Sequence, residues 1–244
     1  MGTAISVDVR DPWVNPSAVD AAFAHFRDVD TRFSTFKPDS EISRLARRDV
    51  TPRACSPDVR EVLALCEEAR RKTAGYFDIR RHRLDGGLDP SGLVKGWSIE
   101  GAARILEAAG ARNFCINAGG DVVARGEAEP GRPWRVGIRH PIDADRLAAV
   151  VLARDLAVAT SGAYERGQHV LDPHTKRPPE GVLSVTVVGP SITWADTYAT
   201  ALFAMGTDGV RWAAETLPDY PACCITTDRR LLWTEGFAQF LERS

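Results

Sequence analysis

Hydrophobic side chains recur every three or four residues in several parts of the chain, which is the period of one helix face. The clearest case follows Asn15-Pro16-Ser17, where the spacing is kept from Val19 to Phe33. Serines at 40 and 56 are suited to cap two further helices, and Gly206 is suited to follow a helix end. The pattern predicts helices over about 17–33, after Ser40, over 57–72, from Trp97 to Gly110, between Ser191 and Gly206, and over 209–217.

Elsewhere apolar and polar residues alternate, which is typical of half-buried strands. This pattern predicts strands at 3–9, 114–116, 122–123, 134–138, 147–152, 156–160, 182–188, 222–227 and 231–234. Short turns join most of these strands, and the helices come in blocks. We therefore expect an α+β fold, with a largely antiparallel sheet and packed helices, and not a doubly wound fold.

Two glycine-containing stretches interrupt this pattern. Thr73 to Asp78 reads as a loop, and so does Leu88 to Gly96, because Pro90 and Gly92 both disfavour regular structure. We accordingly expect the helix that contains Trp97 to begin only at that residue.

Composition narrows the class of protein. With 244 residues, of which 44% are hydrophobic, the chain can form one domain over 1–244. A net charge of −2 predicts no bulk attraction to nucleic acid, and no apolar run is long enough for membrane insertion. The cysteines are odd in number and form no CxxC pair, which disfavours a disulfide framework and a zinc site. No basic and apolar leader precedes the first predicted strand, so we expect a cytoplasmic protein.

Asp196 and Thr200 are the first candidates for chemistry. They lie four residues apart and so share one face of a predicted helix. A carboxylate and a hydroxyl are hard oxygen ligands of the kind that magnesium takes when it also holds a phosphate. The alternative is that Asp196 is a charge favoured by the helix dipole and that Thr200 is a partly buried polar residue.

Three other features are equally ambiguous when taken singly. Lys95 could pair with a phosphate or be a solvated lysine. The turn Asn117-Ala118-Gly119-Gly120-Asp121 could let a ligand approach the backbone or be only a tight hairpin, and it matches neither a P-loop nor GxGxxG. His169 near Asp172-Pro173 could present a base or mark a turn.

In order along the chain, these features match a known family. The motifs are Met1-Gly2-Thr3, Phe33-Ser34-Thr35-Phe36, Gly75-Tyr76-Phe77-Asp78, Asp89 to Gly96, Asn117 to Asp121, His169 to Pro173 and Ala195 to Leu202. This set resembles the FAD:protein FMN transferases, the ApbE family, from residue 1 to about Gly206.

The resemblance implies an ApbE-like fold with a FAD cleft between two subregions. It also implies a Mg2+-dependent enzyme that transfers the FMN moiety of FAD onto a threonine hydroxyl of a client protein and releases AMP. By similarity, the metal ligands would be Asp196, Thr200 and the carbonyl of Gly92. Asp196 would thereby serve catalysis, and His169 would be the general base, with Asp172 as its alternative.

The resemblance also assigns residues to FAD. Flat or apolar contacts would come from Met1, Phe36, Tyr76 and Phe77, and polar edges would be bound by Asp78 and Asp89. Lys95 would assist at the phosphates or at a nearby carboxylate. The remaining expected contacts are Asn117, Gly119, Gly120 and Leu171.

Two departures from the family pattern bear on these expectations. Ser91-Gly92 stands where the family often has two glycines, and Lys176 stands where a glycine is usual. The sequence leaves two other functions open: a FAD pyrophosphatase that gives FMN and AMP, and a FAD-binding protein without turnover. It also does not decide between magnesium and manganese.

Overall fold

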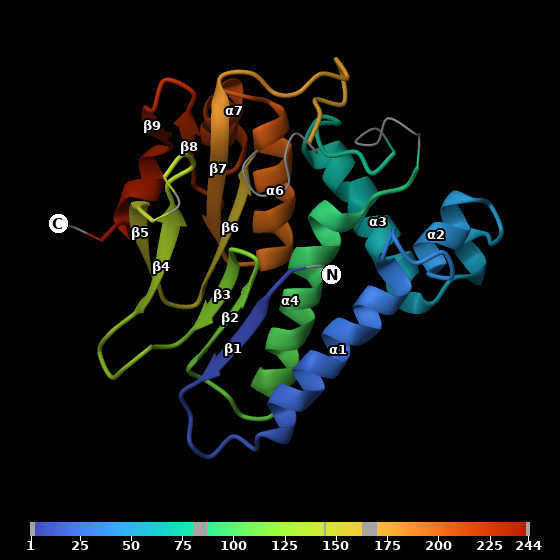
Figure 1. Ribbon diagram of the computed structural model, residues 1–244. Coiled ribbons are helices and arrows are strands. Elements are labelled where there is room, and N and C mark those ends of the chain that lie inside the picture. Colours follow the sequence, from blue (N-terminus) through green and yellow to red (C-terminus); the bar gives the residue numbers. More distant parts are fainter. Residues whose placement is uncertain (1–2, 81–86, 144, 163–169, 243–244) are drawn as a thin grey trace.

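The computed structural model describes residues 3–80, 87–143, 145–162 and 170–242, and its main feature is a seven-stranded antiparallel sheet (Figure 1). The strand order is β1-β2-β3-β6-β7-β8-β9. These strands are β1 (Ile5–Val9), β2 (Phe114–Ala118), β3 (Asp121–Arg125), β6 (Leu156–Gly162), β7 (Val182–Gly189), β8 (Ala222–Thr226) and β9 (Leu231–Trp233). A separate hairpin pairs β4 (Trp134–Arg139) with β5 (Leu147–Ala153). The predicted α+β class with a largely antiparallel sheet is confirmed.

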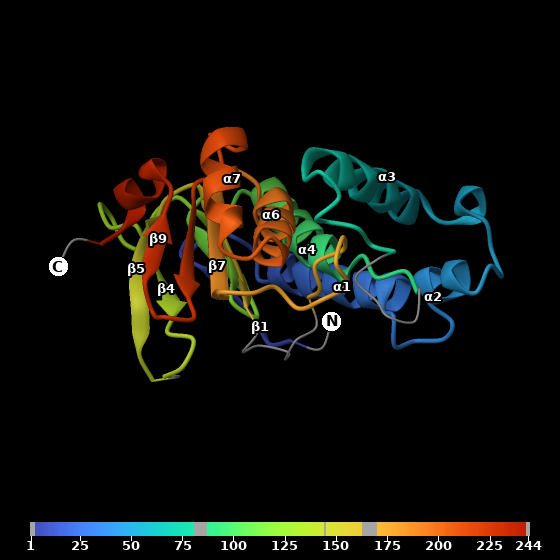
Figure 2. The ribbon, with the colours of Figure 1, turned by 90° about the horizontal axis from the view of Figure 1, so that it is seen from above.

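The helices form two groups. Helices α1 (Ser17–Phe33), α4 (Ser91–Ala108), α6 (Ile192–Ala204) and α7 (Asp208–Thr216) contribute to the core over the sheet. Helices α2 (Glu41–Ala46) and α3 (Pro57–Lys72) lie at the end of the molecule opposite β4 and β5 (Figure 2). Two short 3-10 helices, Pro52–Ala54 and Glu235–Phe240, complete the described elements. No helix in the described ranges is long and apolar enough to cross a membrane.

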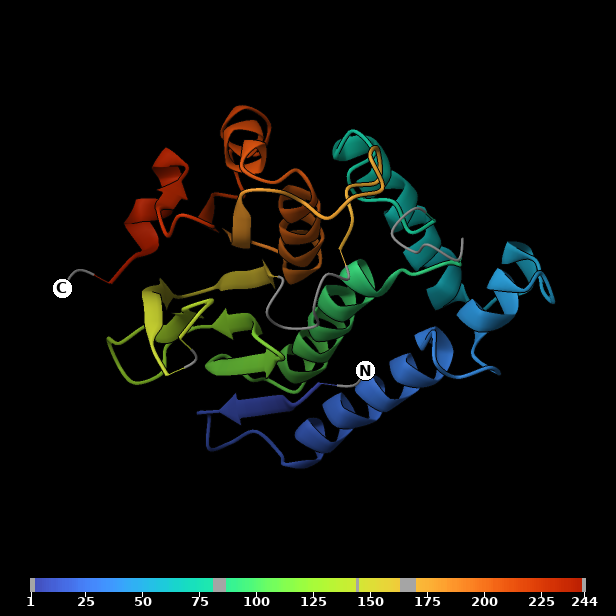
Figure 3. The ribbon, with the colours of Figure 1, turned by 45° about the horizontal axis from the view of Figure 1, so that its top comes forward.

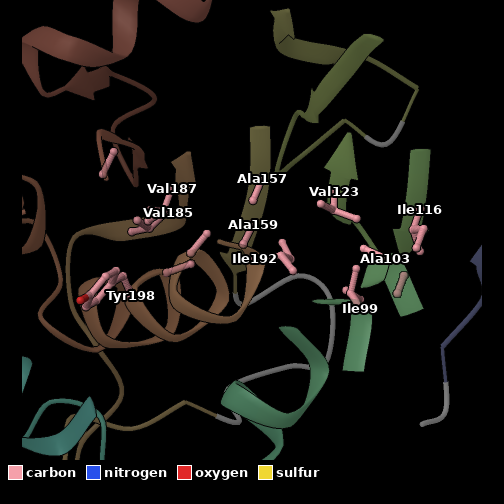
Figure 4. Close-up of a cluster of buried hydrophobic side chains, with 14 of the residues drawn as sticks. Ile99, Ala103, Ile116, Val123, Ala157, Ala159, Val185, Val187, Ile192 and Tyr198 are labelled. Carbon is pink, nitrogen blue, oxygen red and sulfur yellow. The ribbon is translucent and has the colours of Figure 1, made fainter. Parts of the chain in front are cut away.

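Alternating side chains place a hydrophobic layer on each face of the sheet. On one face, Ile116, Val123 and Val185 pack against Ile99 of α4 and Ile192 of α6 (Figure 4). On the other face, neighbouring positions of the same strands pack against the β4–β5 hairpin, with Trp134 and Val136 among the buried residues. The period of two in the sequence thus places a central sheet between helices and a hairpin.

A further hydrophobic cluster joins α2 and α3 to the rest of the chain. It contains Val59 and Val62 of α3, Phe77, and Leu93 and Trp97 of α4. Helix α4 belongs to both main cores, since its later residues Ile99 and Leu106 pack over the sheet. The two subregions therefore meet along this helix.

Helix α4 also corrects one expectation from the sequence. It begins at Ser91 and not at Trp97, so the predicted loop before Trp97 was wrong from Ser91 onward. Pro90 is tolerated because it precedes the first turn, where its missing N–H is not needed, and its carbonyl accepts from the N–H groups of Leu93 and Val94 at 2.9 Å. Glycine remains helical here because tertiary packing outweighs its low helix propensity.

Candidate functional site

Two glycines let α4 and α6 pack with their backbones close together (Figure 3). A Cβ on Gly96 would lie 2.5 Å from the carbonyl oxygen of Ile192 and 2.9 Å from Cα of Thr193. One turn earlier, a Cβ on Gly92 would lie 3.1 Å from Oγ1 of Thr200. Larger side chains would separate the helices, so glycine at both positions brings the first turns of α4 against Asp196 and Thr200.

Asp196 is a buried carboxylate, only 2% exposed, on the face of α6 that meets α4. Its Oδ2 accepts a hydrogen bond from the backbone N–H of Gly96 at 2.9 Å, and its Oδ1 lies 3.9 Å from Nζ of Lys95. Burial raises the pKa of Asp196 well above its ordinary value, and the nearby Asp121 carboxylate raises it further. Buried negative charge of this kind favours a proton or a bound cation.

Asp121, the first residue of β3, completes the charged cluster. It is fully buried, its Oδ2 lies 2.5 Å from Nζ of Lys95, and its Oδ1 accepts from the N–H of Thr160 at 3.1 Å. Among the described residues, two buried carboxylates thus lie beside one ammonium, and such a cluster favours a further positive charge, either a proton on Asp196 or a bound cation. We refer to Lys95, Asp121 and Asp196 as the acid–lysine cluster.

Hydroxyl groups lie beside this cluster. Oγ1 of Thr200 is 3.4 Å from Oγ of Ser161, near the end of β6. Within the described residues, no three His, Cys, Asp or Glu side chains gather closely enough to form a metal site by themselves. A divalent cation here would therefore also need hydroxyl and main-chain oxygens, and Thr200 and the carbonyl of Gly92 are of the right type for magnesium.

Sequence reasoning did not assign Asp121 or Ser161 to the site. Asp121 does stand directly after the Gly119-Gly120 turn, and this proximity was the available signal. The sequence does not show which strands pair or in which register. In the structure, the pairing of β3 with β6 places the N–H of Thr160 against Asp121.

The Gly119-Gly120 turn itself is a hairpin in which both glycines have positive φ, +59° and +95°. A Cβ on Gly119 would overlap Oγ1 of Thr3. Oδ1 of Asn117 accepts from the N–H of Gly120 at 3.0 Å. These residues have a structural role in placing Asp121, and their predicted contacts with FAD remain predictions.

The three described aromatic residues expected to contact FAD occupy different environments. Phe77 is buried, and its ring would lie 3.3 Å from a Cβ on Gly92, so it supports the first turn of α4. Tyr76 is half-buried and makes an edge-on contact with His174, with ring centroids 4.6 Å apart. Phe36 is 93% exposed and is the most accessible of these three residues. None of these contacts tests the predicted roles.

The aspartates expected at the polar edges of FAD make local hydrogen bonds. Oδ1 of Asp89 accepts from the N–H of Ser91 at 3.1 Å, at the start of α4. Oδ1 of Asp78 accepts from the N–H of Arg80 at 2.9 Å. Each aspartate thus fixes a bend in the chain beside the site.

The turn at residues 172–177, ahead of β7, is organised by Asp172. Its Oδ1 accepts from the N–H of His174 and its Oδ2 from the hydroxyl of Thr175, both at 2.8 Å. Lys176 has a φ of +62°, so it keeps a left-handed conformation that glycine adopts more easily. Leu171 is buried next to this turn. The predicted base His169 and the predicted contact Met1 lie outside the described residues.

The chain is similar to known proteins in both sequence and fold. The ApbE family model matches residues 1–86 and 79–224 of the chain. A FAD:protein FMN transferase of Vibrio cholerae is 32% identical over 167 residues, which cover 64% of this chain and 48% of that protein. The chain thus spans about half the length of this curated relative.

Solved structures match over nearly the whole chain. The flavin transferase ApbE from Vibrio cholerae has a TM-score of 0.86 and 25% identity, covering 99% of this chain and 96% of that one. The ApbE protein from Thermotoga maritima has a TM-score of 0.87 at 22% identity, covering 99% and 97%, and supports the fold alone.

Proposed function

The chain belongs to the ApbE family, and from this premise we propose that it transfers the FMN moiety of FAD to a threonine hydroxyl of a client protein and releases AMP. The name of the Vibrio cholerae relative, FAD:protein FMN transferase, supports the proposal. The observation that carries it is the acid–lysine cluster beside Thr200, because two buried carboxylates next to one ammonium are suited to accept a magnesium ion that holds a diphosphate.

We assign the metal to Asp196, Thr200 and the carbonyl of Gly92. When bound, magnesium would neutralise charge on the diphosphate and on the departing AMP. Asp196 and Thr200 contribute negative and neutral oxygen atoms from one face of α6, and Gly96 holds Asp196 in place through its N–H. Lys95 supplies a positive charge for a phosphate oxygen, and Asp121 positions that ammonium.

In the proposed reaction, the threonine Oγ of the client attacks the phosphorus on the FMN side of the diphosphate. The new P–O bond forms while the bond to the AMP oxygen breaks, and AMP leaves with that electron pair. The hydroxyl proton passes to a base, for which we propose His169. Phe36 and Tyr76 would offer flat surfaces to the rings of FAD.

The direct test mixes purified protein with FAD, magnesium and a client domain that carries a flavinylation threonine. We expect a fluorescent client on a denaturing gel, a mass increase equal to the FMN moiety, and one AMP for each modified client. A client with valine in place of that threonine is the matched control and should stay unmodified.

The same assay separates the rival functions. AMP and free FMN formed at equal rates with and without client would identify a pyrophosphatase. Bound FAD with no AMP under any condition would identify a flavin-binding protein. Either result would overturn the transferase proposal, and repeating the assay with manganese would show which ion serves.

A further inference from the structure

Helix α6 begins without a cap from its own segment. Ser191 precedes the helix, yet its side chain accepts no hydrogen bond from the first turn. Instead, Oε2 of Glu100 in α4 accepts from both the hydroxyl of Ser191 and the backbone N–H of Ile192, each at 2.9 Å. A carboxylate at this point satisfies exposed helix donors and interacts favourably with the positive end of the helix dipole.

Glu100 is in turn held by an arginine from the sheet. Arg125, the last residue of β3, approaches Oε1 of Glu100 at 3.4 Å and donates from Nε to Glu107 at 2.9 Å. The side chains of Arg125 and Glu100 are only 18% and 20% exposed, so this pair is less screened by solvent than a surface ion pair.

These contacts involve the same three elements that form the acid–lysine cluster. Lys95 and Glu100 both belong to α4, and Asp121 and Arg125 are the two ends of β3. Asp196 and Ile192 lie one turn apart on α6. A second polar cluster therefore connects α4, β3 and α6, later in α4 than the first, at the other end of β3, and one turn earlier in α6.

Between the two clusters, α4 and α6 are closely packed. The carbonyl of Ile192, whose N–H is bound by Glu100, is also the atom that would lie 2.5 Å from a Cβ on Gly96. Gly96 in turn donates to Asp196. A shift of the α6 start would therefore move Asp196 relative to Gly96 and Lys95.

We propose that Glu100 is a positioning residue for catalysis, which fixes the start of α6 so that Asp196 faces Lys95 and Asp121 and so that Thr200 faces Gly92. The proposal deepens the function proposed above and rests on it for the role of these two residues. We assign Glu100 no direct contact with the metal or FAD. It would affect the reaction only by positioning α6.

The test compares Glu100→Ala and Glu100→Gln with Glu107→Ala, which removes the other carboxylate on Arg125 from the same helix. Three quantities are measured below the unfolding transition: amide hydrogen exchange along α6, magnesium affinity by calorimetry with FAD present, and kcat and KM for FAD.

We expect Glu100→Ala to speed exchange at 192–196 at least tenfold and to weaken magnesium binding by about tenfold or more. It should lower kcat while KM for FAD stays within about twofold, because the flavin contacts lie on other segments. Glu100→Gln, which keeps one acceptor oxygen, should recover part of each effect, and Glu107→Ala should change none of them.

Unchanged exchange and magnesium affinity in Glu100→Ala would overturn the proposal, and so would equal effects of Glu107→Ala. If Glu100→Ala does not fold, the Glu100→Gln variant decides by the same measurements. A wild-type protein that binds magnesium but transfers no FMN would contradict the proposed function. The hydrogen-exchange and magnesium-affinity measurements would still test whether Glu100 positions α6.

Discussion

The backbone N–H of Gly96 donates a hydrogen bond to Oδ2 of Asp196 at 2.9 Å, although 100 positions separate the two residues in the chain. The bond crosses the tight contact between α4 and α6. It joins the helix that carries Lys95 to the helix that carries Thr200. A change at this contact should therefore affect stability and activity together.

Gly96→Ala should destabilise the protein, because the new methyl would meet backbone atoms of Ile192 and Thr193 that cannot rotate away. Overpacking of this kind costs about 1–3 kcal/mol. Chemical denaturation measures the loss, and FMN transfer should fall as well. Gly137→Ala is the control, because it meets only the end of the flexible, exposed side chain of Leu147. A normal denaturation midpoint in Gly96→Ala would contradict the tight helix contact.

Asp196→Asn should abolish metal-dependent turnover, by at least about 100-fold, while the protein stays folded. The amide keeps an acceptor for the N–H of Gly96 but cannot ionise, so it cannot supply the negative oxygen that a cation would bind. Activity and circular dichroism measure the two effects. Asp208→Asn, at the exposed first residue of α7, should retain full activity. Loss of soluble protein in Asp196→Asn alone would indicate a structural role for this carboxyl.

Without metal, the contribution of Asp196 to the stability of the protein should fall as pH rises above about 4. Burial raises the pKa of this carboxyl in the folded state, so the folded protein keeps a proton that the unfolded chain has released. The free energy of unfolding then decreases by up to about 1.4 kcal/mol per pH unit until the folded pKa is passed.

Denaturant titrations in a chelator, from pH 4.5 to 8, test this dependence. The free energy of unfolding of Asp196→Asn should change less with pH than that of the wild type over the same range. Magnesium should restore the stability of the wild type at the higher pH values, because a bound cation favours the ionised carboxylate. Parallel profiles for the two proteins would assign the pH dependence to other groups.

Lys176→Gly should stabilise the protein by about 1 kcal/mol, because Lys176 has a φ of +62° and glycine adopts this conformation without strain. Thermal unfolding measures the gain. Arg177→Gly, next to it in the same exposed loop and without a positive φ, should instead be neutral or destabilising. A lower melting temperature for Lys176→Gly would show that its side chain contributes more than the backbone strain costs.

Phe36→Ala should leave stability within about 0.5 kcal/mol of the wild type, because the ring is 93% exposed. If the ring packs on FAD, affinity should fall by roughly tenfold. Fluorescence quenching on FAD binding measures this, with Trp13→Ala as a control at an exposed aromatic residue elsewhere. Unchanged affinity in Phe36→Ala would remove this residue from the flavin site.

Local pattern was sufficient for most of the fold. In α3, the buried residues Val59, Val62, Cys66 and Ala69 follow the three- and four-residue spacing of one helix face. The start of α4 was missed because Pro90 and Gly92 are breakers only in isolation, and contact with α6 and Phe77 reverses that preference. Sequence alone does not contain that contact.

Some residues of the candidate site could likewise be predicted from the sequence, and others could not. Asp196, Thr200, Gly92 and Lys95 were predicted to act together, and the structure places them side by side. Their roles toward metal and FAD remain predictions. Asp121 and Ser161 were missed because their positions depend on which strands neighbour each other, and one residue of register shift would turn either side chain to the opposite face.

Because α4 contributes to two hydrophobic cores, the helical end and the sheet should melt as one cooperative unit. Its early residues Leu93 and Trp97 are buried with α3, and its later residues Ile99 and Leu106 are buried over the strands. Calorimetry should then give a single peak whose van't Hoff enthalpy equals the measured heat. Partial opening at the helical end would already disturb Lys95, so catalytic loss and global denaturation should share one midpoint.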